Sequence, residues 1–177
     1  LKINMIFSTH GPVRQKHLSD AIAVYDRLSS GKTEKGLVIC YGSMYGNTER
    51  MAEALAEGAA EAGMQKIVIH NLSVSETSFV LADVFRYDTL AIGSPTYNGG
   101  VFPLVEDFFA RLSERIVSNH KLGLFGGYTW SSQAVKKMMA YNEKMKMQLI
   151  DKTVEWKQGV SQDSLSKVKE LGRLLGE

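Results

Sequence analysis

The stretch Leu37–Thr48, LVICYGSMYGNT, passes from an apolar run into a turn of glycine and hydroxyl residues, and an Ala/Glu-rich helical pattern follows it. Backbone N–H groups at the start of a helix have no partner within the helix, and the helix dipole places partial positive charge there. This order of strand, polar turn and helix therefore suits a phosphate group. Ser43, Asn47 and Thr48 add side-chain donors, and Gly46 lets the backbone close around an anion. The turn contains no lysine, unlike the loops that bind a triphosphate, so the pattern predicts one terminal phosphate held by neutral donors.

An alternative interpretation needs no ligand. Gly46-Asn47 is also typical of an ordinary strand-to-helix turn, with Thr48 as the N-cap of the helix. The stretch alone does not decide between the two interpretations, but two other loops favour the phosphate.

Apolar runs alternate with helical patterns after residue 35, which predicts an α/β fold: a doubly wound, five-stranded parallel sheet with helices on both faces. The predicted strands are short and apolar, as buried parallel strands are: Leu37–Tyr41, Lys66–Asn71, Thr89–Gly93, Leu122–Phe125 and Thr153–Trp156. The predicted helices are Thr48–Ala62, Ser75–Phe85, Phe102–Val117, Ser131–Met147 and Gln162–Leu175. Gly63 is placed to end the first helix.

In such a sheet, ligands bind beyond the carboxyl ends of the strands, where the strand order reverses. The loops after the third and fourth strands are Ser94–Gly100, SPTYNGG, and Gly126–Ser131, GGYTWS. Tyr97 and Trp130 on these loops can flank a planar ring, although either ring taken alone can also cap the hydrophobic core. Beside a loop for one phosphate, the two aromatic residues indicate flavin mononucleotide (FMN), which consists of a planar ring, a ribityl chain and one phosphate.

The first residues of the chain form a separate piece. Lys2–Phe7 alternates as a strand does, Ser8–Pro12 is a turn, Leu18–Leu28 is an amphipathic helix, and Ser29–Thr33 is a polar linker. One strand and one helix cannot bury a core, so this piece is expected to dock on the main domain or to belong to another one. The start at Leu1, rather than at a methionine, indicates a truncated or processed product.

Composition excludes several classes of protein. A net charge of +2 over 177 residues indicates no special attraction to nucleic acid or to a membrane surface. The single cysteine, Cys40, excludes an intramolecular disulfide, fits a reducing compartment and is predicted to be a small buried side chain. No signal peptide or membrane-spanning run is evident, and a cytoplasmic location is expected.

Three motifs, SMYGNT, SPTYNGG and GGYTWS, occur in an order that resembles the flavodoxin-like domain of flavodiiron proteins, also called A-type flavoproteins. The resemblance covers Lys35–Glu177, and SPTYNGGVFP is closer to this family than to free flavodoxins. STHGPV, near the start, resembles the closing segment of the family's metallo-β-lactamase-like domain. The resemblance implies two parts: residues 1–34 as the end of that upstream domain plus a linker, and residues 35–177 as the FMN-binding domain.

The resemblance also implies residue roles. By position, His10 corresponds to a ligand of the family's di-iron centre, but the other ligands lie upstream, so His10 is expected to be orphaned and no metal is expected in this chain. His17, His70 and His120 are scattered without ligand spacing and are predicted to be ordinary polar side chains. Thr129 differs from the glycine often found there in the family, as does Ser132. The predicted FMN-binding residues are Ser43, Met44, Tyr45, Gly46, Asn47, Thr48, Pro95, Thr96, Tyr97, Asn98, Gly99, Gly100, Gly127, Tyr128, Thr129 and Trp130.

The function implied by the resemblance is electron transfer within an oxygen or nitric oxide reductase. Electrons would pass from rubredoxin or another donor, through FMN, to the di-iron site of a partner subunit in a head-to-tail homo-oligomer, and this chain alone would be an electron carrier. Two alternatives stay open: a free-standing flavodoxin or FMN-dependent quinone reductase, and a response-regulator-like switch. A switch needs clustered acidic residues after the first strand, where Tyr41, Gly42 and Ser43 stand instead.

Overall fold

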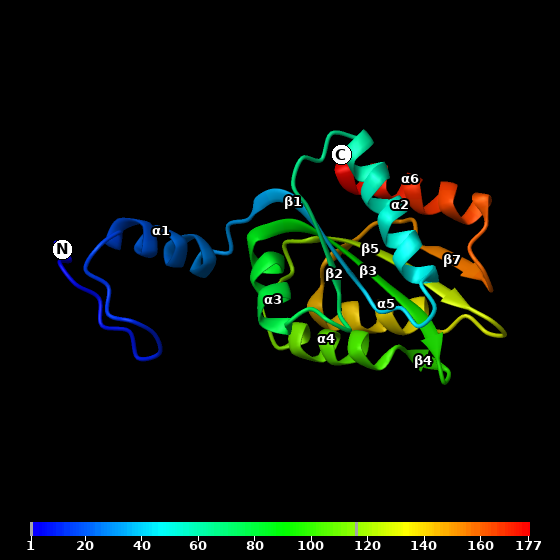
Figure 1. Cartoon of the computed structure of the whole chain (residues 1–177), viewed down its shortest axis with the longest axis horizontal. Helices are drawn as coiled ribbons and strands as arrows, with labels where there is room; N and C mark the ends of the chain where they lie inside the picture. The colour runs from blue at the N-terminus through cyan, green and yellow to red at the C-terminus, as the bar shows by residue number, and fades with distance from the viewer. Residues whose placement is uncertain (1, 116) are drawn as a thin grey trace.

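The protein is a parallel sheet between two layers of helices, with an N-terminal arm that extends away from them (Figure 1). The structure is a computed structural model that describes residues 2–115 and 117–177, so Leu1 and Ile116 lie outside the described residues. In chain order the elements are α1 (Leu18–Ser29), β1 (Glu34–Tyr41), α2 (Asn47–Glu61), β2 (Ile67–Asn71), α3 (Thr77–Arg86), β3 (Tyr87–Tyr97), β4 (Gly100–Val101), α4 (Pro103–Ser113), β5 (Lys121–Tyr128), α5 (Ala134–Met145), β6 (Gln148–Leu149), β7 (Val154–Lys157) and α6 (Gln162–Gly176).

The strand order is β2-β1-β3-β5-β6, and these neighbours pair in parallel. The chain therefore moves outward from β1 to β2 and then returns to the other side of β1 with β3, which places the reversal between β1 and β3. The predicted doubly wound α/β fold is confirmed, with the reversal at the carboxyl ends of these two strands.

The last strand position differs from the prediction, because two short strands share it. β6 pairs with the start of β5 at Lys121 and Leu122, and β7 pairs with the end of β5 from Phe125 to Tyr128. The predicted strand, Thr153–Trp156, corresponds to β7 alone. β6 spans two residues, which is too short for a hydrophobic period to be recognised, and its pairing depends on β5 being beside it.

Each face of the sheet carries its own hydrophobic core. Val38 and Cys40 of β1 point to the face covered by α3, α4 and α5, whereas Leu37 and Ile39 point to the face covered by α2 and α6. Cys40 is fully buried, as predicted, and burial raises the pKa of its thiol. This alternation is the period of two that a strand buried on both faces requires.

Local sequence explains where several helices begin and end. Pro103 opens α4 at its first turn, where its missing N–H costs nothing, and Ser161 and Ser164 form a reciprocal capping box at the start of α6. Gly63 follows the C-cap of α2 with φ +95°, as predicted. The predicted helix from Ser131 begins later, at Ala134, where the side chain of Thr96 accepts hydrogen bonds from the first backbone N–H groups.

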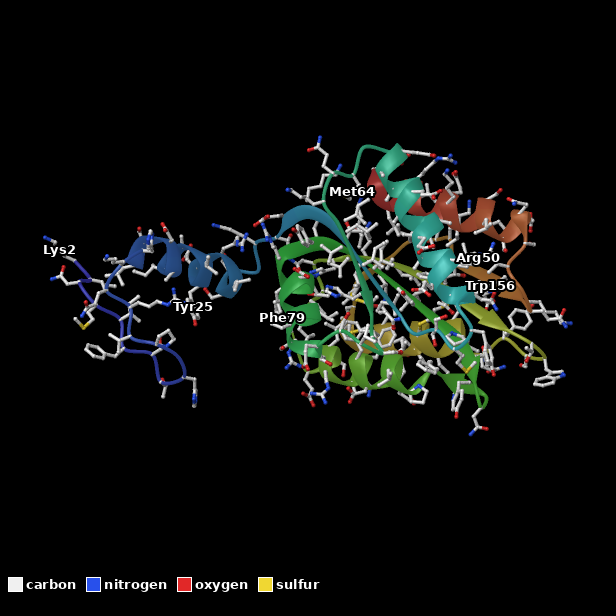
Figure 2. All side chains as sticks on the ribbon, in the orientation of Figure 1. Lys2, Tyr25, Arg50, Met64, Phe79 and Trp156 are labelled. Carbon is white, nitrogen blue, oxygen red and sulfur yellow. The ribbon has the colours of Figure 1, made fainter. Side chains whose placement is uncertain are left out.

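The N-terminal arm does not contain the predicted strand Lys2–Phe7. Only Ile6 pairs, in an isolated antiparallel bridge with Arg14, because no sheet edge lies beside the segment to complete a ladder. The predicted helix is present as α1, but none of its residues is buried. Figure 2 shows Tyr25 of α1 far from the core that contains Trp156.

Candidate functional site

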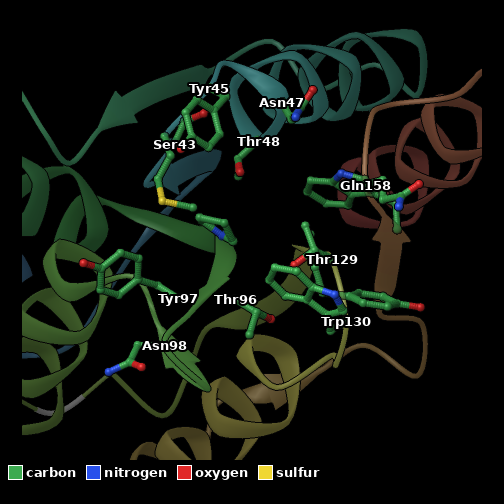
Figure 3. A pocket seen from close by; sticks show the side chains of 15 residues that line it. Ser43, Tyr45, Asn47, Thr48, Thr96, Tyr97, Asn98, Thr129, Trp130 and Gln158 are labelled. Atoms are coloured by element: carbon green, nitrogen blue, oxygen red, sulfur yellow. The ribbon is translucent and has the colours of Figure 1, made fainter.

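A pocket of about 390 Å³ opens at the carboxyl ends of β1, β3 and β5, where the strand order reverses (Figure 3). This volume lies within the range of small-molecule sites, on the order of 300–1,000 Å³. Three loops that are distant in sequence meet there, as the sheet rule predicts, and the end of β7 closes one side. The pocket is lined by Ser43, Met44, Tyr45, Asn47, Thr48, Pro95, Thr96, Tyr97, Asn98, Gly127, Tyr128, Thr129, Trp130, Trp156 and Gln158.

The start of α2 has features of an anion site. Its N-cap is Gly46, with φ +79°, and no side chain caps the first turn. The alternative with Thr48 as N-cap is wrong, since Thr48 is the second residue of α2 and is almost fully buried. The amide N–H of Gly46 donates to Ser43 Oγ at 3.1 Å, so this bond shapes the turn itself. The next N–H groups of α2, at Asn47 and Thr48, have no side-chain cap and belong to residues that line the pocket, so a bound anion could accept their hydrogen bonds.

The second loop is held by hydroxyl groups. The buried Ser94 Oγ accepts from Phe102 N at 3.0 Å and donates to the carbonyl of Pro95 at 2.9 Å. Thr96 Oγ1 accepts from the backbone N–H groups of Gln133 and Ala134, both at 3.2 Å, and so caps the start of α5. The loop is therefore tied to two helices, and its rim keeps a defined position.

The tip of this loop is a tight hairpin. β3 and β4 pair antiparallel from Tyr97 to Gly100, which leaves Asn98 and Gly99 as a two-residue connection with φ +45° and +68°. Positive φ at both positions is typical of a type I′ turn, for which Asn-Gly is the preferred pair. The hairpin holds Tyr97 at the rim, and its ring meets Phe102 edge-on at 6.0 Å between centroids.

The two predicted aromatic residues are exposed. Trp130 is 94% exposed and Tyr97 is 46% exposed. The alternative that Trp130 caps the hydrophobic core is therefore wrong. Figure 3 shows Tyr97 and Trp130 on opposite sides of the pocket, from separate loops. A large apolar face left in solvent at a pocket rim marks a binding surface.

Part of the third loop belongs to the sheet. Gly127 and Tyr128 are the last residues of β5 and pair with Trp156 and Lys157 of β7. Thr129 is therefore the first residue beyond the sheet whose backbone is available to a ligand. Gly127 is required for close packing, because a Cβ there would lie 2.7 Å from Cζ2 of Trp156.

No charged side chain lines the pocket among the described residues. The carboxylate of Glu49 lies outside this lining, where its Oε1 accepts a hydrogen bond from Tyr41 OH at 2.8 Å. Burial, together with this bond, raises the pKa of Tyr41 to about 12. Glu155 accepts a hydrogen bond from Ser132, and burial raises the pKa of the Glu155 carboxyl group. A ligand in this pocket meets neutral donors, the α2 dipole and aromatic faces.

Most of the predicted residues lie together in the pocket, but Gly46, Gly99 and Gly100 do not line it. Gly46 and Gly99 instead provide the positive φ that the two turns need. Sequence reasoning missed Trp156, the last residue of the predicted fifth strand, and Gln158, the residue that follows the observed strand β7. The rule that ligands bind at strand ends offers a signal for Gln158, once the position of β7 beside β5 is known.

The predicted histidine roles are mixed. His120 is buried, and its ring nitrogens lie 2.9 Å from the carbonyl oxygen of Val117 and 2.7 Å from that of Val84. His70 pairs with Asp83 at 2.9 Å.

In residues 2–115 and 117–177 no group of three or more His, Cys, Asp or Glu side chains is placed to hold a metal ion. In the same ranges no helix has the length and apolar character needed to cross a bilayer.

Comparisons with known proteins agree with this geometry. Residues 39–172 match the family model described as Flavodoxin. The chain is 32% identical to a nitric oxide reductase of Moorella thermoacetica over 98% of its length, which is 43% of that protein. It is 31% identical to the type A flavoprotein fprA of Rhodobacter capsulatus over its whole length, which is 42% of that protein.

A solved structure gives the same relationship. The flavodiiron protein of Giardia intestinalis superposes with a TM-score of 0.90 and 29% identity, over 99% of this chain and 44% of that one. The chain thus spans less than half the length of these relatives. It matches the flavodoxin portion of flavodiiron proteins.

Proposed function

Because the chain belongs to the flavodoxin family, we propose that its pocket binds FMN and that the protein serves as an electron-transfer domain. The observation that carries this proposal is the pairing of an uncapped helix start with two exposed aromatic rings in one uncharged pocket. A single phosphate suits the first feature and a planar ring suits the second. Bound FMN supplies the redox chemistry, which the protein orients and tunes.

The residues present fit this cofactor. The uncapped amides at the start of α2 and the Thr48 hydroxyl would hold the phosphate, with Ser43 shaping the turn around it. Tyr97 and Trp130 would lie against the two faces of the ring. The backbone N–H of Thr129 would favour negative charge at the nearby ring edge, whereas the aromatic faces would disfavour it. The balance of these two effects would set the reduction potential.

The similarity to flavodiiron proteins supports a finer proposal. The domain would take electrons from a rubredoxin-like donor and pass them to a di-iron site in another part of a longer, homo-oligomeric protein. The terminal reaction would reduce oxygen or nitric oxide, and the named activity of the Moorella relative is consistent with the second. The neutral pocket and modest net charge give no reason to expect nucleic acid or a membrane as a partner, and a cytoplasmic location fits the single reduced cysteine.

The N-terminal arm supports the proposed division of the chain at residue 34. The family model begins at residue 39, beyond the arm. The arm carries Phe7 and Tyr25, which are 74% and 76% exposed, together with further exposed apolar residues. We propose that residues 1–34 are the end of an upstream domain plus a linker, that the rest of that domain covers these side chains, and that His10 is a di-iron ligand only when that domain is present.

Purified protein titrated with FMN and with FAD tests the cofactor assignment. The expected result is a flavin absorption spectrum after FMN is added, and tighter binding of FMN than of FAD, because the start of α2 offers a site for one phosphate. Equal or tighter binding of FAD would contradict the phosphate assignment. Absence of binding by either flavin would overturn the proposal as a whole.

A further inference from the structure

Two pocket residues come from the end of β7, away from the three loops that the sequence singled out. Trp156 is 5% exposed and belongs to the core on the α2 and α6 face. Its indole packs against Gly127, where a Cβ would lie 3.0 Å from Nε1. Every fully buried side-chain nitrogen or oxygen in the described part of the chain has a hydrogen-bond partner, and Trp156 is one of the residues that line the pocket. Part of the indole therefore faces the open volume of the pocket.

Gln158 follows β7 in an unusual conformation. Its φ is +63°, in the left-handed region that residues other than glycine and asparagine rarely adopt. Its backbone N–H donates to the carbonyl of Tyr128 at 2.7 Å, which fixes the end of β7 to the end of β5. Such backbone strain persists where the surrounding structure requires it, and it often marks a ligand site. Gln158 is one of the residues that line the pocket.

The position of this wall defines what it contacts. Figure 3 shows Gln158 on the side of the pocket between Asn47, at the start of α2, and Thr129, beside the ring-binding loop. In the proposed site the phosphate lies at α2 and the ring lies between Tyr97 and Trp130. The wall formed by Trp156 and Gln158 would then face the part of the ligand that joins ring and phosphate.

We propose that Trp156 Nε1–H and the Gln158 side-chain amide bind the hydroxylated chain between ring and phosphate. An indole N–H only donates, and an amide both donates and accepts, so the pair complements the hydroxyl groups of a polyol. The wall has no cation to attract a second phosphate. This inference rests on the proposed FMN function and assigns a subsite within it.

Three ligands separate the parts of the flavin. FMN has ring, chain and phosphate; riboflavin lacks the phosphate; lumiflavin has the ring alone. Their affinities are measured by fluorescence titration for the full chain and for Trp156→Phe and Gln158→Gly. Glycine removes the amide side chain while keeping φ +63° accessible, and Lys146→Gly, at φ +56° on the C-cap of α5, is the matched control outside the pocket.

Each variant is expected to bind FMN and riboflavin about three- to tenfold more weakly, the effect of one lost neutral hydrogen bond, with lumiflavin unchanged. Lys146→Gly should leave all three affinities unchanged. If lumiflavin binding weakens as much as FMN binding, the two residues have a general packing role and the inference is overturned. If only FMN binding weakens, the contact is to the phosphate, and the inference is overturned as well. If Trp156→Phe does not fold, Gln158→Gly decides. Failure of the unaltered protein to bind FMN would overturn the proposed function, a distinct result.

Discussion

Some pocket residues are exposed to solvent and others are buried. This difference decides whether a substitution is expected to affect ligand binding alone or folding as well. Trp130 is almost wholly in solvent, so it contributes little to folding and its role is at the ligand. Thr48 is 2% exposed, so its hydroxyl lies where water competes little with a bound anion. The two residues therefore allow ring contacts and phosphate contacts to be tested separately.

Replacing Trp130 with alanine should weaken FMN binding without affecting folding. The lost aromatic contact is worth on the order of 1 kcal/mol, or about fivefold in affinity. Water would then reach the ring and ease formation of the charged reduced flavin, so the midpoint potential should become less negative. Flavin titration and potentiometry measure both effects, and thermal unfolding of the apoprotein should be unchanged. A lowered melting temperature with unaltered affinity would place Trp130 in the folding core instead.

Thr48→Val removes the hydroxyl and keeps the branched shape of the side chain. The loss of one charge-assisted bond to a phosphate should cost about 1.5–3 kcal/mol of FMN binding, with little change in potential because the site is remote from the ring. Thr48→Ser keeps the hydroxyl and is the matched control. If Thr48→Val shifts the potential as much as Trp130→Ala does, the phosphate and ring ends have been placed wrongly.

At the level of elements, α2 is held in position by direct backbone contact with α6. A Cβ on Gly58 of α2 would lie 1.9 Å from the carbonyl oxygen of Lys169, and one on Gly172 of α6 would lie 2.0 Å from that of Leu55. Only glycine allows this approach. Since the start of α2 forms the proposed phosphate site, the contact between the two helices also positions the site.

Gly172→Ala should therefore destabilise the protein, although alanine is the better helix former by roughly 1 kcal/mol. Separation of the helix backbones should lower the free energy of unfolding by about 1–3 kcal/mol. Urea denaturation measures the change. Ser166→Ala, on an exposed position of the same helix, is the control and should be neutral or slightly stabilising. Unchanged stability of Gly172→Ala would mean that the helices separate at no cost.

The same pair of helices predicts a dependence on pH. Hydrogen bonds from Lys169 and Arg173 lower the pKa of the Glu61 carboxyl below its ordinary value of 4.5. A carboxyl group whose pKa is lowered by folding stabilises the folded state while it is ionised. The contribution of Glu61 to the free energy of unfolding is therefore complete above about pH 4.5 and is lost as pH falls through the lowered pKa. Glu61→Gln should flatten the decline in stability over this acidic range, as followed by urea denaturation at several pH values. Glu143→Gln, on the exposed surface of α5, should keep the decline. An unaltered profile for Glu61→Gln would contradict the linkage.

In the whole molecule, the arm and the sheet domain are largely independent. No residue of the arm lines the pocket at the strand ends, and α1 buries none of its residues. The arm meets the domain through few contacts, among them Asn119 Nδ2 donating to the Gly31 carbonyl at 2.7 Å and the ion pair of Arg27 with Glu34. Its exposed apolar side chains form a surface that a partner could cover.

Deleting residues 1–33 should accordingly leave a cooperatively folding domain with unchanged FMN affinity. Thermal unfolding and flavin titration of the shortened and full chains provide the comparison. Removal of exposed apolar side chains should also reduce self-association, which sedimentation measures at matched concentrations. Loss of cooperative unfolding, or weaker flavin binding, would show that the arm supports the domain.

The sequence by itself determined the alternation of strands and helices, the sheet class and the three loops at the pocket. These features are encoded by hydrophobic periodicity and by turn residues, such as the run Leu37–Tyr41 and the Asn98-Gly99 pair. Such patterns favour the same local structure whatever the rest of the chain does. Tertiary structure alone decided that β6 and β7 share one sheet position, that Thr96 caps α5, and that Trp156 and Gln158 join the site. Each of these depends on which distant strand lies alongside, and pairing between segments far apart in the chain leaves no signal within either segment.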